Sequence, residues 1–193
     1  MRRVKARKRS LSRAASKPRW RVWYATKEPL LQFSGKFCVL LAGFHFLLLI
    51  PICQRMVDSS TVGYARLSSL ILNWFGEGAH FTGGTIWTGH FGITVLPACT
   101  AIELPLFFAA LVIAFPSSAV RKILGILVGG ALLLGLNLLR VMNLYFLGVH
   151  LPKLFDIAHE QLWGTIFTSV TVVLSVVWIT WAAKVARNEV RAI

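Results

Sequence analysis

Three residues with reactive side chains, Cys99, Arg140 and His159, lie in or at the ends of separate hydrophobic segments. An ionised thiol is a nucleophile, and a neighbouring imidazole takes its proton or returns one to a leaving amine. An arginine stays protonated and offers paired N–H donors to a tetrahedral oxyanion. If the chain brings them together, these side chains suit attack on a carbonyl carbon through a thioester.

The segments that must position these residues are long and apolar. The chain has 193 residues, 56% of them hydrophobic, and a mean hydropathy of +0.67, which is too apolar for one soluble core. A transmembrane helix needs about 20 mostly apolar residues. Because backbone polar groups in hydrocarbon must bond within their own segment, we expect an all-α integral membrane protein with about four transmembrane helices. The four stretches that meet or approach this length are residues 37–53, 100–116, 123–147 and 162–183.

The second of these stretches is the shortest. It contains Glu103 and has Pro105 near its start. Such a segment spans only where the bilayer thins or where its flanking residues lie in the interface.

The basic residues predict the orientation. Of the 21 Lys and Arg residues, 12 precede residue 37, two lie between the second and third segments and three follow the fourth. By the positive-inside rule these parts are cytoplasmic. We therefore expect a basic cytoplasmic N-terminal segment (1–36), one membrane-embedded catalytic domain (37–183) and a basic cytoplasmic tail (184–193).

The basic N-terminal stretch also raises the alternative of nucleic-acid binding. A polybasic segment beside a membrane span is more simply an orientation signal, and it anchors the chain to anionic lipid headgroups at about 1 kcal/mol per cation. We therefore expect membrane lipids as its surroundings and no nucleic-acid partner.

Residues 54–98 are expected to lie on the extracytoplasmic side. Apolar residues at helical spacing predict an amphipathic helix over residues 65–75, on the membrane surface. The stretch that follows is rich in Gly, Thr and aromatic residues, with rough alternation of apolar and polar positions. It predicts a short β-hairpin or extended loop that leads into the second membrane segment.

This topology places the three reactive residues on the extracytoplasmic side. Cys99 begins the second helix, where the positive end of the helix dipole favours a thiolate. Arg140 precedes Leu147, the expected outer end of the third helix, by seven residues, or about 10 Å of depth. His159 begins the fourth helix. An arginine within a membrane segment is a functional candidate because its burial is costly without a partner.

Each residue also has a simpler interpretation. Cys99 could be a small hydrophobic residue, or it could form a disulfide with Cys53 across the outer boundary. His159 could be an interfacial polar residue. Arg140 could pair with Glu103, which lies one turn after Cys99 on the same helical face. The coincidence of three reactive types at one side of the membrane favours a site.

Other polar residues flank these three. Asn137 and Asn143 stand three residues on either side of Arg140 and could orient it, although packing hydrogen bonds are an equal alternative. Trp163, four residues after His159, is expected at the interface, where it would line the cleft. No cofactor or metal is expected, since His80 and His90 lie ten residues apart without a tight carboxylate or thiol cluster.

Three runs of the sequence resemble the signature regions of the exosortase and archaeosortase family of membrane transpeptidases. That family has a Cys beside a small hydroxyl residue, an N-x-x-R motif on a later helix and a His at the start of another. The resemblance covers about residues 55–181 and is greatest to the compact exosortase H type. Many members have Gly after the hydroxyl residue, where this chain has Ala101. The runs are PACTAIELPLF, with Cys99 and Thr100; LNLLRVMNLYFLG, with Asn137 and Arg140; and FDIAHEQLWG, with His159.

The resemblance implies an enzyme of the bacterial inner membrane. Its substrates would be secreted proteins whose C-terminal tail holds a recognition motif, a transmembrane helix and a basic cluster. The resemblance implies Cys99 as nucleophile, His159 as general acid and base and Arg140 as clamp on the carbonyl oxygen. It implies a thioester that passes to a lipid or another surface acceptor. Residues that would bind or orient the substrate are Thr100, Glu103, Asn137, Asn143 and Trp163.

Two other functions stay open. One is a simple membrane cysteine protease, in which water resolves the thioester. The other is a non-catalytic membrane subunit or small transporter, in which Glu103 and Arg140 line a polar path.

Overall fold

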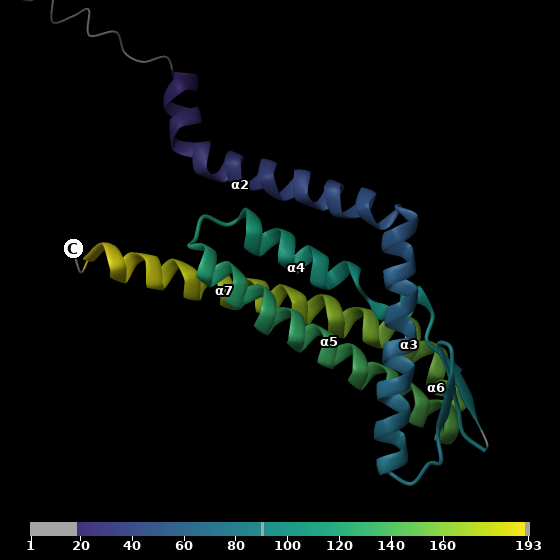
Figure 1. The fold of residues 1–193 in the computed structure, drawn as a ribbon. Coiled ribbons are helices and arrows are strands. Elements are labelled where there is room, and N and C mark those ends of the chain that lie inside the picture. The colour runs from purple at the N-terminus through teal and green to yellow at the C-terminus, as the bar shows by residue number, and fades with distance from the viewer. Residues whose placement is uncertain (1–18, 90, 192–193) are drawn as a thin grey trace, which may run out of the picture.

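The computed structural model of the protein describes residues 19–89 and 91–191 (Figure 1). It is nearly all helical and confirms the predicted all-α class. The long helices run side by side, and the turn between α4 and α5 lies at the same end of the bundle as the C-terminus. The helices are α2 (Arg19–Leu48), α3 (Pro51–Trp74), α4 (Glu103–Ala114), α5 (Ala119–His150), α6 (Pro152–Ile157) and α7 (Trp163–Arg191).

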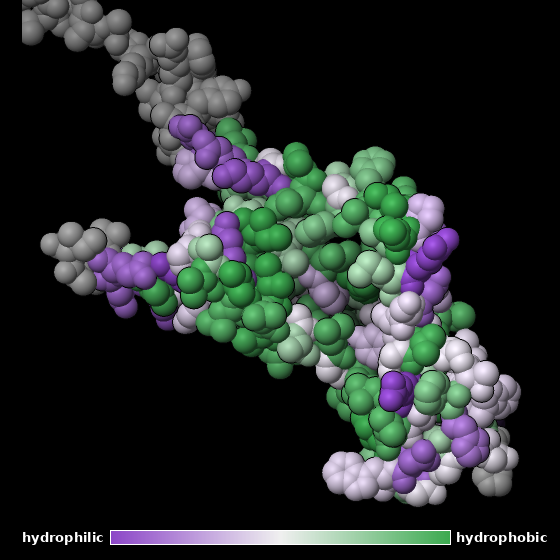
Figure 2. Space-filling view, viewed as in Figure 1, coloured by the Kyte–Doolittle hydropathy of each residue, from purple (hydrophilic) through white to green (hydrophobic). Residues whose placement is uncertain are grey.

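Three parts of the chain are long and apolar enough to cross a membrane. They are Lys27–Leu48 of α2, all of α5, and the run Pro152–Glu189, which contains most of α7. Hydrophobic side chains gather over these helices, and hydrophilic ones lie toward the ends of the bundle (Figure 2). α4 has 12 residues, about 18 Å of helix against a hydrocarbon core of about 30 Å. The protein is thus a multi-pass membrane protein with three long apolar helices and a shorter fourth.

The first helix differs at both ends from the prediction of residues 37–53. It ends at Leu48, because Pro51 provides no backbone N–H and holds the preceding residue, Ile50, in an extended conformation. Cys53 therefore belongs to α3. The helix begins at Arg19, so the second half of the predicted basic segment is helical, whereas residues 1–18 lie outside the described residues.

α3 crosses the bundle at the end opposite the C-terminus, called here the sheet end (Figure 1). The helix predicted over residues 65–75 is its C-terminal part, so the helix is longer than predicted. Its apolar residues Leu67, Leu70 and Trp74 are exposed. Small and polar residues such as Ala65 and Ser68 form the buried face instead.

The predicted hairpin is present and extended by one strand. β1 (His80–Thr82), β2 (Thr85–Trp87) and β3 (Gly92–Thr94) form an antiparallel sheet in that order. The sheet lies against α3, and Gly84 makes this approach close. A Cβ at Gly84 would lie 2.9 Å from the Val95 carbonyl oxygen and 3.1 Å from Oγ1 of Thr61.

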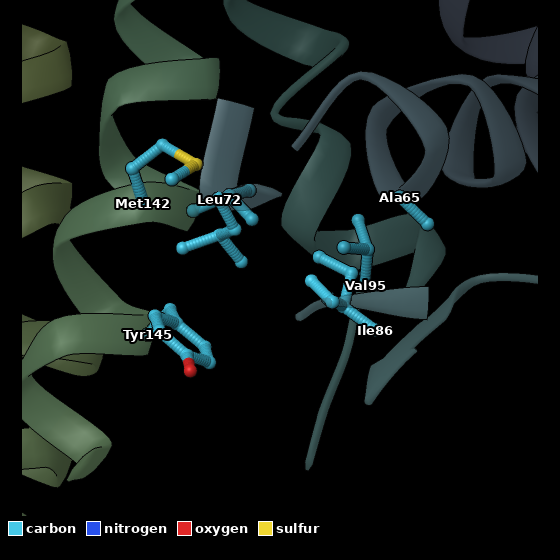
Figure 3. Close-up of a cluster of buried hydrophobic side chains, with 8 residues drawn as sticks. Ala65, Leu72, Ile86, Val95, Met142 and Tyr145 are labelled. Carbon is cyan, nitrogen blue, oxygen red and sulfur yellow. The ribbon is translucent and has the colours of Figure 1, made fainter. Parts of the chain in front are cut away.

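A core at the sheet end joins α3, the sheet and α5. Figure 3 shows Leu72 of α3 beside Met142 and Tyr145 of α5, with Ile86 and Val95 of the sheet region nearby. The Tyr145 hydroxyl donates to Oε2 of Glu77 at 2.8 Å, so the loop after α3 is tied to α5. This core holds the chain just before Cys99, because Val95 is part of it.

A second core lies within the long helices and depends on two glycines of α5. A Cβ at Gly125 would overlap the Trp178 indole of α7, and one at Gly129 would overlap the Phe108 ring of α4. Phe108 and Trp178 are buried in the same cluster. α4, α5 and α7 therefore pack closely, which sets the positions of the turns at their sheet ends.

Candidate active site

Cys99 lies in a separate turn before α4 rather than at the start of that helix. The turn is the 3₁₀ helix η1 (Pro97–Thr100). Within it, the amide N–H of Cys99 donates to the Leu96 carbonyl at 2.8 Å. α4 begins only at Glu103. The prediction that Cys99 opens a long helix is wrong on this point. The argument from a helix dipole therefore does not apply to its thiol.

The turn is closed by its own side chain and by an uncommon backbone conformation. Thr100 is buried, and its hydroxyl donates to the Pro97 carbonyl at 2.7 Å. Ala101 has a φ of 48°, the left-handed conformation that glycine adopts more easily than alanine. Glycine, which the resemblance leads one to expect here, would meet this requirement without strain. Ala101 departs from that pattern but keeps the backbone turn.

His159 lies beside the thiol. Its Nε2 atom is 3.6 Å from Sγ of Cys99. The imidazole belongs to a π-helical turn, η2 (Ala158–Leu162), between α6 and α7. Phe155 stacks on the ring with a centroid distance of 5.9 Å and an interplanar angle of 4°. The stacking restrains the ring plane, and the π turn sets which side of the helix His159 projects from.

Asn143 and Trp163 join α5 to α7 behind this pair. The Trp163 indole N–H donates to Oδ1 of Asn143 at 3.0 Å. Trp163 is buried and packs with Ala158, the residue before His159. Asn143 therefore bonds to Trp163, which fixes the start of α7 next to the imidazole.

Arg140 is partly buried and is not paired with Glu103. Within the part of the chain that the structure describes, the one ion pair joins Arg121 to Glu189 at 2.6 Å. Glu103 is exposed, and Nε of Arg140 is buried without a hydrogen-bond partner. Arg140 precedes Val141, which lies in the core that Cys99 contacts. Among the described residues, no hydrogen bond joins Arg140 to the thiol or the imidazole.

Asn137 lies one turn before Arg140 and is 1% exposed. Neither side-chain atom of Asn137 has a hydrogen-bond partner among the described residues. A buried amide of this kind costs about 1–3 kcal/mol for each unmade bond. It belongs to a buried polar group at the interface between α3 and α5.

A cleft of about 600 Å³ lies beside the Cys99 turn, between the junction of α2 and α3 and the start of α4. Pro97 and Ala101 line it on either side of Cys99, although Cys99 itself does not. Asp58 and Glu103 place carboxylates along it. A second cavity of about 270 Å³ continues between α2 and α4. The two share Leu48, Glu103 and Leu104.

The three cysteines are free, so the alternative of a disulfide between Cys53 and Cys99 is wrong for this structure. In residues 19–89 and 91–191, no group of three or more His, Cys, Asp or Glu side chains is arranged to hold a metal ion. His80 is exposed at the start of β1, and His90 lies outside the described residues.

Two features of the site were not predicted from the sequence. The left-handed conformation of Ala101 has no local signal, since alanine is otherwise a helix former. Phe155 stands four residues before His159, the spacing at which side chains on a helix meet. That spacing was the available signal for the stacking.

Fold and site together define a multi-pass membrane protein with a thiol and an imidazole in contact at one end of its helices. The sequence model of the transmembrane exosortase family, of the EpsH type, matches residues 22–181. The chain therefore belongs to the transmembrane exosortase family. Membership makes it a membrane protein that processes sorting signals, and the family acts on secreted proteins that carry such signals at the C-terminus. The comparison with curated proteins gave no match, and neither did the comparison with solved structures.

Proposed function

We propose that the protein is a cysteine transpeptidase that cleaves the C-terminal sorting signal of secreted proteins and transfers them to a lipid or surface acceptor. The observation that carries this proposal is the 3.6 Å separation between Sγ of Cys99 and Nε2 of His159. A nucleophile in contact with a base is the arrangement that covalent acyl transfer requires. Family membership supports the same class of reaction.

In the first half of the reaction, the Cys99 thiol gives its proton to His159 Nε2, and Sγ bonds to the scissile carbonyl carbon. The carbonyl oxygen becomes an oxyanion, for which Arg140 is the proposed partner because its guanidinium is a permanent charge. The C–N bond then breaks, and the leaving amine takes the proton back from Nε2. The product is a thioester on Cys99.

In the second half, an acceptor nucleophile attacks the thioester carbonyl. Its proton passes to His159 Nε2, the C–S bond breaks, and the thiolate recovers the proton. Nε2 must be unprotonated at the start of each half, so Nδ1 carries the hydrogen in the resting imidazole. Stacking on Phe155 supports this role because it leaves the ring edge directed at the sulfur.

The groove along α4 is the proposed path for the substrate tail. Its inner part between α2 and α4 is lined by apolar residues such as Phe44 and Phe107. Its other part reaches Pro97 and Ala101, on either side of the nucleophile. A tail with a hydrophobic helix would lie along the inner part, with its motif at the thiol. Glu103 lines both parts and is the residue placed to orient the tail.

We propose that the chain lies in the bacterial inner membrane, with both termini in the cytoplasm and the active site outside. The support is the distribution of basic residues, together with the position of the C-terminal end of α7 and of the turn after α4 at the end away from the sheet. A secreted protein would then meet Cys99 after its export.

The test is processing of a co-expressed secreted protein that ends in a motif, a hydrophobic helix and basic residues. Replacement of Cys99 by Ala should abolish processing while the protein stays in the membrane. Cys53→Ala is the matched control, because Cys53 is also a free and partly buried thiol but lies on α3. Full processing by the Cys99 variant would refute the proposal.

The processed secreted protein from this experiment also distinguishes transfer from hydrolysis. Mass spectrometry of the new C-terminus should find an added acceptor group if the thioester is passed on. A free carboxylate would instead assign the protein to simple cysteine proteases.

A further inference from the structure

A buried polar group lies where α3 packs against α5, and only its arginine has a role in the proposed reaction. Its members are Tyr64 and Ser68 on α3, and Asn137 and Arg140 on α5. Within the described part of the chain, each has at least one buried side-chain atom without a hydrogen-bond partner. Ser68 is fully buried, and Asn137 is 1% exposed.

The spacing of these residues places one pair on a single face of each helix. Tyr64 and Ser68 are four residues apart, so they share a face of α3, and Asn137 and Arg140 are three residues apart on α5. The two faces meet, because Ala65 and Leu72 of α3 lie in one core with Val141 of α5. Burial raises the pKa of Tyr64, and the Asn137 side chain opposes this rise, which agrees with that arrangement. Tyr64 also packs against the core that contains Val141, next to Arg140, and that Cys99 contacts.

The group contains one permanent cation. Arg140 Nε and the Asn137 amide nitrogen only donate, whereas Asn137 Oδ1 and the two hydroxyl oxygens can also accept. No ion pair to Arg140 exists among the described residues. A buried cation with unmade hydrogen bonds is costly, about 1–3 kcal/mol for each missing bond and more for a charged group. Such a group is stabilised by an oxygen acceptor, and hydrogen bonds in active sites often tighten only when substrate is bound.

We propose that Tyr64 is a positioning residue of the active site, which acts through Asn137 to orient the Arg140 guanidinium toward the carbonyl oxygen of the bound substrate. Ser68 lies one turn after Tyr64 on the same face of α3, and we assign it the same role toward Asn137 and Arg140. This inference rests on the proposed function, because it assigns Arg140 to the substrate oxygen. It adds α3, a helix outside the motifs that carry the reactive residues, to the catalytic machinery.

The test uses the full-length protein in lipid nanodiscs, with a purified secreted protein that ends in a motif, a hydrophobic helix and basic residues as substrate. Tyr64→Phe removes the hydroxyl and keeps the ring. It should lower kcat by about 10-fold to 100-fold, the scale expected when a catalytic group is misplaced. KM should change by less than about twofold, because the effect is on the transition state rather than on ground-state binding.

A double-mutant cycle separates positioning from a structural role. In an Arg140→Lys background, Tyr64→Phe should lower the residual kcat by less than about threefold, since residues that act through one another are not additive. Equal effects of Tyr64→Phe in both backgrounds would overturn the proposal, as would an unchanged kcat or a change confined to KM.

Two serines of α3 provide a second variant and its control. Ser68→Ala should also lower kcat. It replaces Tyr64→Phe as the test variant if the Tyr64 variant does not fold. Ser69→Ala should leave kcat unchanged, because Ser69 is equally buried but its hydroxyl already donates to the Arg66 carbonyl at 2.8 Å. Loss of activity in both serine variants would contradict a specific role for this face.

The wild type and Cys99→Ala belong in the same assay. If both process the substrate equally, the proposed function fails. If the wild type processes it, Cys99→Ala does not and Tyr64→Phe does so at the wild-type rate, the positioning role alone fails.

Discussion

Sγ of Cys99 lies 3.6 Å from Nε2 of His159, although the two residues are 60 positions apart in the chain. The contact joins a 3₁₀ turn held against α3 to a π-helical turn at the start of α7. Neither turn is part of a regular membrane helix. The reactive pair is therefore set by two short irregular segments, each placed by the long helices beside it.

His159→Gln should lower processing of the tailed substrate by at least about 100-fold, because the amide cannot take and return the thiol proton. Processing is measured by pulse-labelling, with the amount of membrane-inserted protein as reference. His150→Gln is the control, since His150 is an exposed imidazole at the end of α5. Wild-type processing by the His159 variant would show that the imidazole is not the base.

Glu103→Gln should change the free energy of unfolding by no more than about 0.5 kcal/mol, because Glu103 is exposed and makes no ion pair with Arg140.

Arg140→Lys should keep the charge but lower kcat by about 100-fold, since lysine lacks the planar pair of donors. Chemical denaturation and the nanodisc assay measure the two effects. A large loss of stability in Glu103→Gln, matched by Arg140→Lys, would show that the two residues are paired after all.

Ala101→Gly should stabilise the protein slightly. Glycine adopts the left-handed conformation without the steric cost of alanine, which stabilises the folded state by about 1–2 kcal/mol. The greater freedom of glycine in the unfolded chain offsets about 0.4–1 kcal/mol of this gain. The expected net gain is about 0.5 kcal/mol. Thermal unfolding in detergent measures it.

Ala109→Gly provides the opposite expectation for the same substitution. Ala109 lies within α4, where glycine should cost about 1 kcal/mol. Equal destabilisation of both variants would contradict the argument from the left-handed conformation of Ala101.

Gly129 and Gly130 are neighbours on α5 that should respond differently to alanine. A Cβ at Gly129 would overlap the Phe108 ring, so Gly129→Ala should destabilise the protein by about 1–3 kcal/mol. A Cβ at Gly130 would meet nothing within 4 Å, so Gly130→Ala should be neutral or stabilising by up to about 1 kcal/mol. Equal unfolding temperatures for the two variants would rule out the packing of α4 on α5 described here.

Much of the fold could be predicted from local patterns. Apolar length located three long helices, and the Gly- and Thr-rich stretch before Cys99 predicted strands. The helix boundaries were less accurate. Residues 37–53 were assigned to one helix, although Pro51 separates α2 from α3, and α4 proved shorter than residues 100–116. Hydropathy measures the apolar content of a segment, but it does not locate a break that leaves the content unchanged.

By itself, the sequence determined that this is a helical membrane protein with a Cys, an Arg and a His in motifs of one family. Those are properties of composition and of short runs, so they can be detected without a fold. Only the tertiary structure decided which of these residues meet. It brings Cys99 to His159, leaves Arg140 without Glu103, and gives Thr100 and Trp163 hydrogen bonds inside the protein. Such contacts depend on the packing of distant helices and on the exact turn between them, and no local pattern records either.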